Sequence, residues 1–372
     1  MGEGAQYEGI CQAENKQVEP FFSIIIPVFN GEAFIEDCLN SIVHQRFGDD
    51  EILVINDGSS DATLQKIMAF ADQYSQVRVI DLGRNQGAAA ARNRGISESR
   101  GRFLLFVDGD DVIAQDLLAS LHQKISSESV EDLKLVVFGL VEEYFDENNR
   151  QTGRKEVIPS GLVSEDKREI RKAIIELEGQ TLYGYLWNKV YNRAYLKSLD
   201  LTIPDMKILE DIYFNIQYCQ DIDSIIVMET APYTYKKRYG TATGRRIPDY
   251  YQIHKGRMER LMAQYESWGM LTESNRQALG LTYTRYLFSS IQRIRKKEIE
   301  IGGKSTGEWL AQVFETDQVY CELIEKSEVP VHGILSFMYR SLKEKRVFQI
   351  ELIAKGIHFV EKWLRPLYLK VK

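Results

Sequence analysis

The sequence predicts an α/β fold in which helices flank a mostly parallel sheet and a helical region follows toward the C-terminal end. Two observations predict this fold class. Short apolar runs alternate with segments of helical periodicity between residues 22 and 111, and that order implies crossover connections and a sheet covered on both faces. From Pro248 onward nearly every segment has helical periodicity.

Four strands are expected in the first part of the chain, at 22–28, 51–55, 77–80 and 102–107. Helices are expected between them, over 34–43, over 64–71 and from residue 88 onward. A further strand is expected at 135–140, followed by a polar stretch through Arg154 and helical patterns from Ser164. Amphipathic segments near 249–266, 275–297, 306–326 and 332–365 make up the helical region. We therefore expect a loose leader over 1–20, an α/β domain over 21–245 and a helical domain over 246–372.

Composition narrows the class of protein. The formal net charge of the 372 residues is −7, which argues against nucleic acid as the main partner because phosphate binding needs a basic field. The four cysteines are scattered without CxxC spacing, so neither a disulfide framework nor a zinc site is expected. The sequence shows no signal-peptide pattern and no apolar run long enough to cross a bilayer. We expect a cytoplasmic protein, soluble or held at a membrane surface.

Polar side chains cluster where each of the first four strands ends. In parallel sheets the carboxyl ends of the strands line the ligand-binding crevice. One such cluster is also typical of an ordinary turn, but four in succession predict one lined cleft. The clusters are Asn30, Asn56-Asp57, Arg84-Asn85 and Asp108-Gly109-Asp110-Asp111.

The fourth cluster predicts a divalent cation site. Three carboxylates around Gly109 place like charges in a small volume, which is costly unless a cation neutralises them. Oxygen ligands suit Mg²⁺ or Mn²⁺, and Mg²⁺ takes phosphate oxygens for its other positions. Asp108 and Asp110 are expected to face the ligand, and Asp111 to point away and cap a helix that begins near Ala114. The alternative is a common Asp-Gly-Asp turn.

The second and third clusters predict recognition of a nucleotide. Asp57 can accept a hydrogen bond from the edge of a base, the alternative being a plain Asx turn. Arg84 and Arg92 can offset the charge of a diphosphate. The alanine-rich segment 88–91 between them is equally well explained by tight packing of a helix on the sheet.

Three later segments offer further candidates. Glu210-Asp211 opens an apolar helical segment, where a desolvated carboxylate would have a raised pKa suited to a general base; the alternative is an acidic pair that complements the helix dipole. Trp187-Asn188 can stack on and bind a sugar ring, or be part of the core. The basic run 236–240, with Lys237 and Arg238, can close over a diphosphate as a lid, or be a solvated surface.

These motifs, in this order, resemble the family 2 inverting glycosyltransferases with the GT-A fold, especially bacterial enzymes that build surface polysaccharides. The resemblance runs from Phe22 to about Tyr239. It rests on residues 23–30, 54–61, 85–93 and 106–111, with support from 187–191 and 210–211. One departure is Asn56, where many relatives carry Asp.

The resemblance implies transfer of a sugar from a nucleotide diphosphate donor, most often a UDP-sugar, to the hydroxyl of a glycan or a lipid-linked glycan. It implies Asp211 or Glu210 as the general base, Asp110 as a ligand of Mn²⁺ or Mg²⁺, Asp108 near the ribose and Asp57 at the base of the nucleotide. Asp108 is also predicted to hold the metal together with Asp110. Trp187 and Asn188 are the candidates for acceptor binding. The donor-binding residues are predicted to be Pro27, Val28, Asn30, Asp57, Arg84, Asn85, Arg92, Asp108, Gly109, Lys237 and Arg238.

Two other classes of protein compete with this interpretation. One is a non-catalytic nucleotide-binding partner of a glycan-assembly complex, and the other is a sugar nucleotidyltransferase. The segment from Ser341 to Lys372 is a separate matter, since it has eight Lys/Arg against three Glu and carries Trp and Phe. Such a basic amphipathic tail can lie on an anionic membrane, and the alternatives are packing on its own protein or a homodimer contact.

Overall fold

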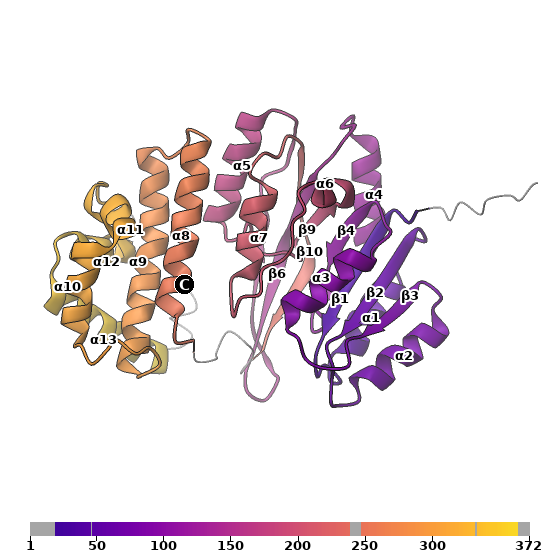
Figure 1. Ribbon diagram of the computed structural model, residues 1–372, viewed down its shortest axis with the longest axis horizontal. Helices are drawn as coiled ribbons and strands as arrows, with labels where there is room; N and C mark the ends of the chain where they lie inside the picture. The colour runs from indigo at the N-terminus through magenta and orange to yellow at the C-terminus, as the bar shows by residue number, and fades with distance from the viewer. Residues whose placement is uncertain (1–18, 46, 239–246, 332, 364–372) are drawn as a thin grey trace, which may run out of the picture.

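The computed structural model describes residues 19–45, 47–238, 247–331 and 333–363. A ten-stranded mixed sheet runs through the first part of the chain, with the order β3-β2-β1-β4-β9-β6-β10-β5 and with β7 and β8 paired to β6 and β10. Helices pack along the sheet, and a separate group of C-terminal helices lies at the opposite end of the molecule from β2 and β3 (Figure 1). The predicted α/β class with a C-terminal helical region is confirmed.

The parallel half of the sheet is formed by β1 (Phe22–Val28), β2 (Asp50–Asn56), β3 (Val77–Asp81) and β4 (Phe103–Phe106). These strands are continuous apolar runs, and Ile24, Ile25 and Ile26 of β1 are fully buried, as expected for a sheet covered on both faces. Their carboxyl ends lie at one edge of the sheet, which is where the polar clusters follow.

The second half of the sheet contains β5 (Val112–Ile113), β6 (Leu135–Phe145), β9 (Lys189–Asn192) and β10 (Ile225–Lys237). Strand β9 is antiparallel to both β4 and β6, and β10 is parallel to β6. Strands β6 and β10 therefore end at the same edge of the sheet as β1, β2 and β4.

The polar stretch after residue 140 is more regular than its sequence indicates. Strand β6 extends to Phe145, and β7 (Gln151–Val157) folds back on it as an antiparallel hairpin, with β8 (Leu162–Ser164) on the other side of β10. Five of the seven side chains of β7 are exposed, so the strand lacks the apolar alternation that would reveal it. Backbone pairing at the sheet, rather than burial, defines this strand.

Helices α1 (Ile35–Val43), α2 (Thr63–Gln73), α3 (Ala88–Glu98) and α4 (Leu117–Ser127) connect the first strands, and α5 (Lys167–Gly179), α6 (Arg193–Ser198) and α7 (Glu210–Tyr218) connect the later ones. Helix α3 packs directly on β1 and β2. A Cβ on Gly95 would lie 2.3 Å from Ile25 Cγ2, so small residues allow the close approach. The packing interpretation of this small-residue helix is therefore correct.

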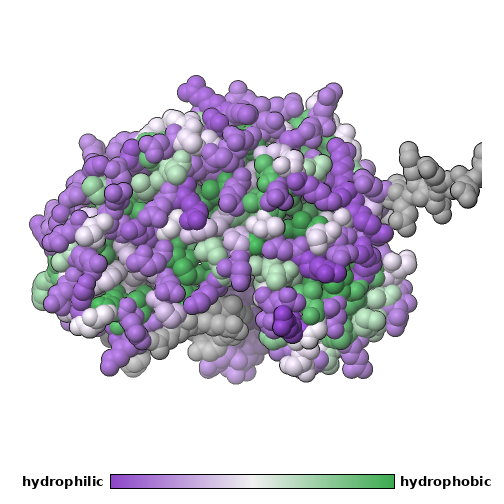
Figure 2. Space-filling view, viewed as in Figure 1, coloured by the Kyte–Doolittle hydropathy of each residue, from purple (hydrophilic) through white to green (hydrophobic). Residues whose placement is uncertain are grey.

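The helical group contains α8 (Tyr250–Ser267), α9 (Glu273–Arg295), α10 (Thr306–Thr316), α11 (Gln318–Tyr320), a π-helical turn (Cys321–Glu325), α12 (Gly333–Lys343) and α13 (Val347–Trp363). Helix α8 packs on α7 and on α9, and its Met258 and Leu261 are fully buried. The face drawn in Figure 2 is mostly hydrophilic, and its apolar residues form small separate groups.

In the part of the chain that the structure describes, no helix has both the length and the apolar character needed to cross a membrane. The predicted basic tail lies partly outside the described residues. Of its earlier part, Ile350 and Ala354 are fully buried, whereas Phe348 is 81% and Leu352 59% exposed. Helix α13 thus packs one face on its own protein, as one of the alternatives proposed, and membrane contact stays a prediction.

Candidate active site

The loops that follow β1 and β2 are joined by reciprocal hydrogen bonds. Asn30 has a positive φ of 50°, which Asn adopts more readily than most residues. Its backbone N–H donates to Ser59 Oγ at 2.9 Å, and its Oδ1 accepts from the backbone N–H of Ser60 at 2.8 Å. The side chain predicted to bind the donor therefore also fixes the two loops that would face it.

Asp57 organises the third loop. Its carboxylate is 3% exposed and accepts hydrogen bonds from the backbone N–H groups of Gln86 at 2.7 Å and Gly87 at 2.9 Å. This holds the loop of Arg84 and Asn85, whose side chains are exposed, at the start of α3. A carboxylate has about four acceptor positions, so these two bonds leave capacity for the N–H of a nucleotide base.

Gly58 lets the second and third loops touch, and its replacement is expected to destabilise the protein. Its φ is +67°, and a Cβ would lie 2.4 Å from the backbone of Arg84. We expect Gly58→Ala to lower the free energy of unfolding by about 2–3 kcal/mol, the left-handed backbone accounting for about 1–2 of it. Urea denaturation measures the loss. Gly83→Ala is the matched control because its φ is +70° with no atom within 4 Å of the Cβ, and equal losses in the two variants would contradict the proposed clash.

The Asp-Gly-Asp-Asp turn follows β4 and contains two kinds of carboxylate. Asp111 is fully buried, and it accepts from Tyr233 Oη and from the backbone N–H of Lys236, both at 2.8 Å. Burial, followed by the neighbouring Asp110 and Asp108, raises the pKa of Asp111 well above its usual value. The prediction that Asp111 caps a helix near Ala114 is wrong, because β10 provides its partners and α4 begins only at Leu117.

Gly109 places this turn directly against β1. A Cβ on Gly109 would lie 3.2 Å from the carbonyl oxygen of Pro27 and 3.3 Å from Val28. The backbone N–H of Asp57 donates to the carbonyl of Val28 at 2.8 Å. Pro27 and Val28 therefore bring the loop of Asp57 and the turn of Asp108 to one place.

Arg92 of α3 gathers three carboxylates from two other elements. The side chain is 7% exposed and lies 2.7 Å from Asp108, 3.3 Å from Glu210 and 3.6 Å from Asp211. These three carboxylates raise the pKa of Arg92 although its burial opposes this, so the guanidinium is always charged. The structure thus brings Asp108 together with Glu210 and Asp211, more than 100 residues away in the sequence.

Asp211 differs from its two neighbours in its contacts. Asp108 Oδ1 and Glu210 Oε1 accept hydrogen bonds from Arg92, whereas Asp211 Oδ1 is buried and accepts none from the described residues. Desolvation raises the pKa of Asp211 to about 7, against the opposing charge of Arg92. The residue before this pair, Leu209, has a positive φ of 66°, an uncommon backbone conformation for leucine that is often associated with functional sites.

Lys189 lies behind this cluster, and the sequence assigns it no role of its own. Its Nζ is fully buried and donates to the carbonyls of Leu182 and Tyr185 and to Asn188 Oδ1, at 2.7–2.9 Å. Burial lowers the pKa of Lys189 to about 7. The signal in the sequence is the position of this lysine within the segment 187–191, which supports the family resemblance.

The residues predicted to bind the acceptor are part of the core. Trp187 is 3% exposed, and its ring stacks on Tyr185 at 4.4 Å and on Tyr233 at 4.2 Å. Asn188 is fully buried and donates to the carbonyls of Phe138 and Leu182. Stacking on a sugar would need an accessible ring face, so this geometry corresponds to the core alternative for Trp187 and Asn188.

The basic pair at the end of β10 lies beside the turn. Arg238 donates to the carbonyl of Asp110 at 2.8 Å, lies 3.5 Å from its carboxylate and covers the ring of Phe34. Lys237 pairs with Glu142 at 2.5 Å. Residues 239–246 lie outside the described residues, so the structure brings Arg238 to the site without addressing the predicted lid.

Asp108 and Asp110 suit a cation that takes its remaining ligands from a substrate. The side chain of Asp110 is 42% exposed, and burial together with the charge of Asp108 raises its pKa, so an added cation would relieve a real repulsion. Within the described ranges, no group of three or more His, Cys, Asp and Glu side chains could hold a metal. The donor set therefore fits the Mg²⁺-type arrangement of one or two carboxylates with phosphate oxygens and does not form an all-protein cage.

Comparisons with known proteins identify a matching family model, similar sequences and a similar fold. The model of glycosyl transferase family 2 matches residues 23–200, which include β1 to β4 and the Asp108 turn. EpsJ, an uncharacterised glycosyltransferase of Bacillus subtilis (strain 168), is 28% identical over 229 residues, which are 60% of this chain and 63% of that protein. EpsH of the same organism, a putative glycosyltransferase by name, is 29% identical over 220 residues, 58% of this chain and 61% of that protein. The chain thus matches about three fifths of the length of these relatives.

A solved structure has a similar fold. The crystal structure of Staphylococcus aureus TarS residues 1–349 in complex with UDP-GlcNAc has a TM-score of 0.61 at 21% identity, over 91% of both chains. By sequence, TarS of strain Mu50, named a poly(ribitol-phosphate) beta-N-acetylglucosaminyltransferase, is 29% identical over 224 residues, 59% of this chain and 36% of that protein. Residues 23–200 thus match glycosyl transferase family 2, and the fold of the chain is similar to that of TarS.

Proposed function

We propose that this protein transfers a sugar from a UDP-sugar to the hydroxyl of a glycan or a lipid-linked glycan, with inversion at the anomeric carbon. The observation that carries the proposal is the convergence of Asp108, Glu210 and Asp211 on Arg92 at the carboxyl ends of the parallel strands. The fold shared with a protein that binds UDP-GlcNAc supports the class of donor.

Asp211 is the general base in this proposal. A base must take the proton of the acceptor hydroxyl as the new bond forms, and it works best when its pKa is close to the operating pH. The pKa of Asp211 is raised to about 7, and its Oδ1 accepts no hydrogen bond from the described residues. Glu210 and Asp108 are held by Arg92 instead, which favours Asp211 over Glu210 in this role.

The leaving diphosphate needs positive charge around it, because negative charge grows on it as the bond to the sugar breaks. Arg84 and Arg238 lie on the loops that follow β3 and β10, and Arg238 is in contact with Asp110. A Mn²⁺ or Mg²⁺ ion held by Asp110 and Asp108 would supply Lewis-acid stabilisation of the same diphosphate. Asp57 orients the donor through its base.

The division of roles among the carboxylates supports the proposed inversion. A retaining mechanism through a covalent intermediate would need a second carboxylate as nucleophile beside the anomeric carbon. Both neighbours of Asp211 in the cluster are hydrogen-bonded to the permanently charged Arg92. The direct displacement therefore needs only Asp211 and the acceptor.

A donor screen tests the proposal. The full-length protein is incubated with a panel of UDP-sugars and glycan acceptors, with Mn²⁺, Mg²⁺ or EDTA, and UDP release is measured. We expect UDP release from at least one donor, lost in EDTA, and an inverted anomeric configuration in the product by NMR. UDP binding by calorimetry without release from any donor would instead indicate a non-catalytic partner, and pyrophosphate release from UTP and a sugar phosphate would indicate a nucleotidyltransferase.

A further inference from the structure

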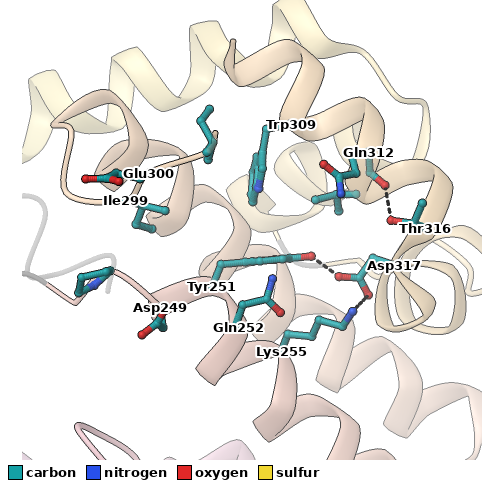
Figure 3. Close-up of a pocket in the computed structure, with 13 residues that line it drawn as sticks. Asp249, Tyr251, Gln252, Lys255, Ile299, Glu300, Trp309, Gln312, Thr316 and Asp317 are labelled. Atoms are coloured by element: carbon teal, nitrogen blue, oxygen red, sulfur yellow. Dashed lines mark hydrogen bonds and ion pairs between the residues drawn. The ribbon is translucent and has the colours of Figure 1, made fainter. Parts of the chain in front are cut away.

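A polar cavity lies in the helical group, separate from the carboxylate cluster. Its volume is about 310 Å³, at the lower end of the usual range of about 300–1,000 Å³ for small-molecule sites. It is lined by α8, by the segment after α9 and by α10 with its following turn (Figure 3). None of the residues assigned to donor, metal or base lines it.

The charged groups among the described lining residues already have partners in the protein, which favours a neutral ligand. Lys255 Nζ lies 3.6 Å from Asp317 Oδ1, and Asp249 pairs with Lys207 at 3.6 Å. Glu300, the third carboxylate among these residues, is also engaged. An ionic ligand would therefore find no free countercharge among the described lining residues.

The remaining lining combines amides with apolar edges. Gln252 and Gln312 present side-chain amides, which both donate and accept hydrogen bonds, and Trp309 packs edge-on against Tyr251 with ring centroids 5.1 Å apart. The floor is fixed, since Asp317 is 3% exposed on its side chain and accepts from Tyr251 Oη and Tyr283 Oη. Mixed amide, carboxylate and aromatic groups on a rigid floor suit a neutral polyhydroxylated ligand.

The lining of the cavity is connected to α7, the helix that carries Glu210 and Asp211. Helix α8 begins at Tyr250, after β10 has ended at the carboxyl edge of the sheet, and Asp249 pairs with Lys207 at 3.6 Å. Lys207 precedes Glu210 by three residues. Tyr213, one helical turn after Glu210, donates from its Oη to the carbonyl of Ile253 in α8. The base and the cavity are thus connected through α7 and the start of α8.

We propose that this cavity binds a neutral saccharide unit of the acceptor glycan, away from the unit that receives the new sugar. The proposal rests on the proposed transferase function, because it takes the ligand to be a part of the acceptor. It assigns acceptor recognition to the helical group rather than to Trp187 and Asn188, which are buried.

Saturation-transfer NMR tests the proposal on the full-length protein. The probe is a set of methyl glycosides and disaccharides of glucose, galactose and N-acetylglucosamine, with inorganic phosphate and methylammonium in parallel. We expect saccharide signals with the parent protein and none from phosphate. Gln252→Ala is expected to weaken saccharide binding about tenfold, because the ligand loses hydrogen bonds to the amide. Gln252→Trp is expected to abolish binding, because Gln252 is an exposed lining residue and the larger Trp side chain in its place would fill the cavity.

Gln123→Trp is the matched control, since Gln123 is exposed on α4 and does not line the cavity; we expect it to bind saccharides as the parent does. Saccharide binding that survives in Gln252→Trp, or a signal from methylammonium or phosphate alone, would overturn the proposal. Release of UDP by the parent protein is measured separately. Release without saccharide binding at the cavity refutes only this inference, whereas absence of release from every donor refutes the transferase function on which it rests.

Discussion

Asp211→Asn is expected to reduce sugar transfer by about 10²–10⁴-fold, the usual contribution of a positioned general base. Asn keeps the size of the side chain and cannot take the proton of the acceptor hydroxyl. The measurement is UDP release under saturating donor and acceptor, with Glu210→Asn as the comparison on the same helix turn. A parent-like rate in Asp211→Asn, with a large loss in Glu210→Asn, would assign the base to Glu210 instead.

The pH dependence supplies a second readout for Asp211. Its pKa is raised to about 7, so the base is protonated and inactive below that pH, and kcat should rise with pH through about 7 and then level off. The pKa of Asp211 is raised from its usual value of 3.8 to about 7 in the folded protein. The free energy of unfolding therefore decreases as the pH increases between these two values, because the unfolded state loses the proton first. Asp211→Asn lacks this cost, and we expect its Tm at pH 8 to equal or exceed that of the parent. A lowered Tm would mean that the lost activity reflects lost structure.

Asp110→Asn is the second substitution with a large expected effect. It removes one charge from the pair that would hold the cation, and metal assistance to a leaving group contributes several kcal/mol, so we expect UDP release to decrease by about 10²-fold or more. We also expect the Mn²⁺ concentration for half-maximal activity to increase. The side chain of Asp110 is 42% exposed, so we do not expect its substitution to unfold the protein. A loss of activity would therefore reflect the lost charge.

The control for Asp110→Asn is Asp116→Asn. Asp116 is an exposed residue before α4 whose side chain makes no capping hydrogen bond, and we expect parent-like activity from it. An unchanged Mn²⁺ dependence in Asp110→Asn would refute the assignment of Asp110 as a metal ligand. It would leave the proposal for Asp211 to be tested by its own variant.

The sequence was sufficient to predict the parallel part of the fold and the edge of the sheet at which the polar clusters lie. The runs at β1, β2 and β4 are apolar because both faces of the sheet are covered, and the polar residues that follow them have to lie at one edge of a parallel sheet. Asp57, Asp108 and Asp110 could therefore be selected before their neighbours were known. Strand β7 could not, because its side chains are exposed and only its backbone pairing defines it.

Trp187 and Asp111 show where local pattern was insufficient. The sequence places Trp187 beside polar residues, but whether its ring faces a cavity or the core depends on Tyr185, two residues before it, and on Tyr233 of β10. Asp111 has the sequence context of a helix cap, and its partners come from β10 instead. Hydrogen-bond partners more than 100 residues away leave no local signal.

The sequence by itself determined the fold class, the succession of strands and helices along the parallel half and the carboxylates offered at the strand ends, because these follow from apolar periodicity and chain direction. Only the tertiary structure decided which carboxylates meet and how they differ. Arg92 binds Asp108 and Glu210 but leaves Asp211 Oδ1 without a hydrogen bond among the described residues, and burial then raises the pKa of Asp211. Burial and contacts between distant residues set the pKa of an acidic side chain, and both arise only when the chain folds.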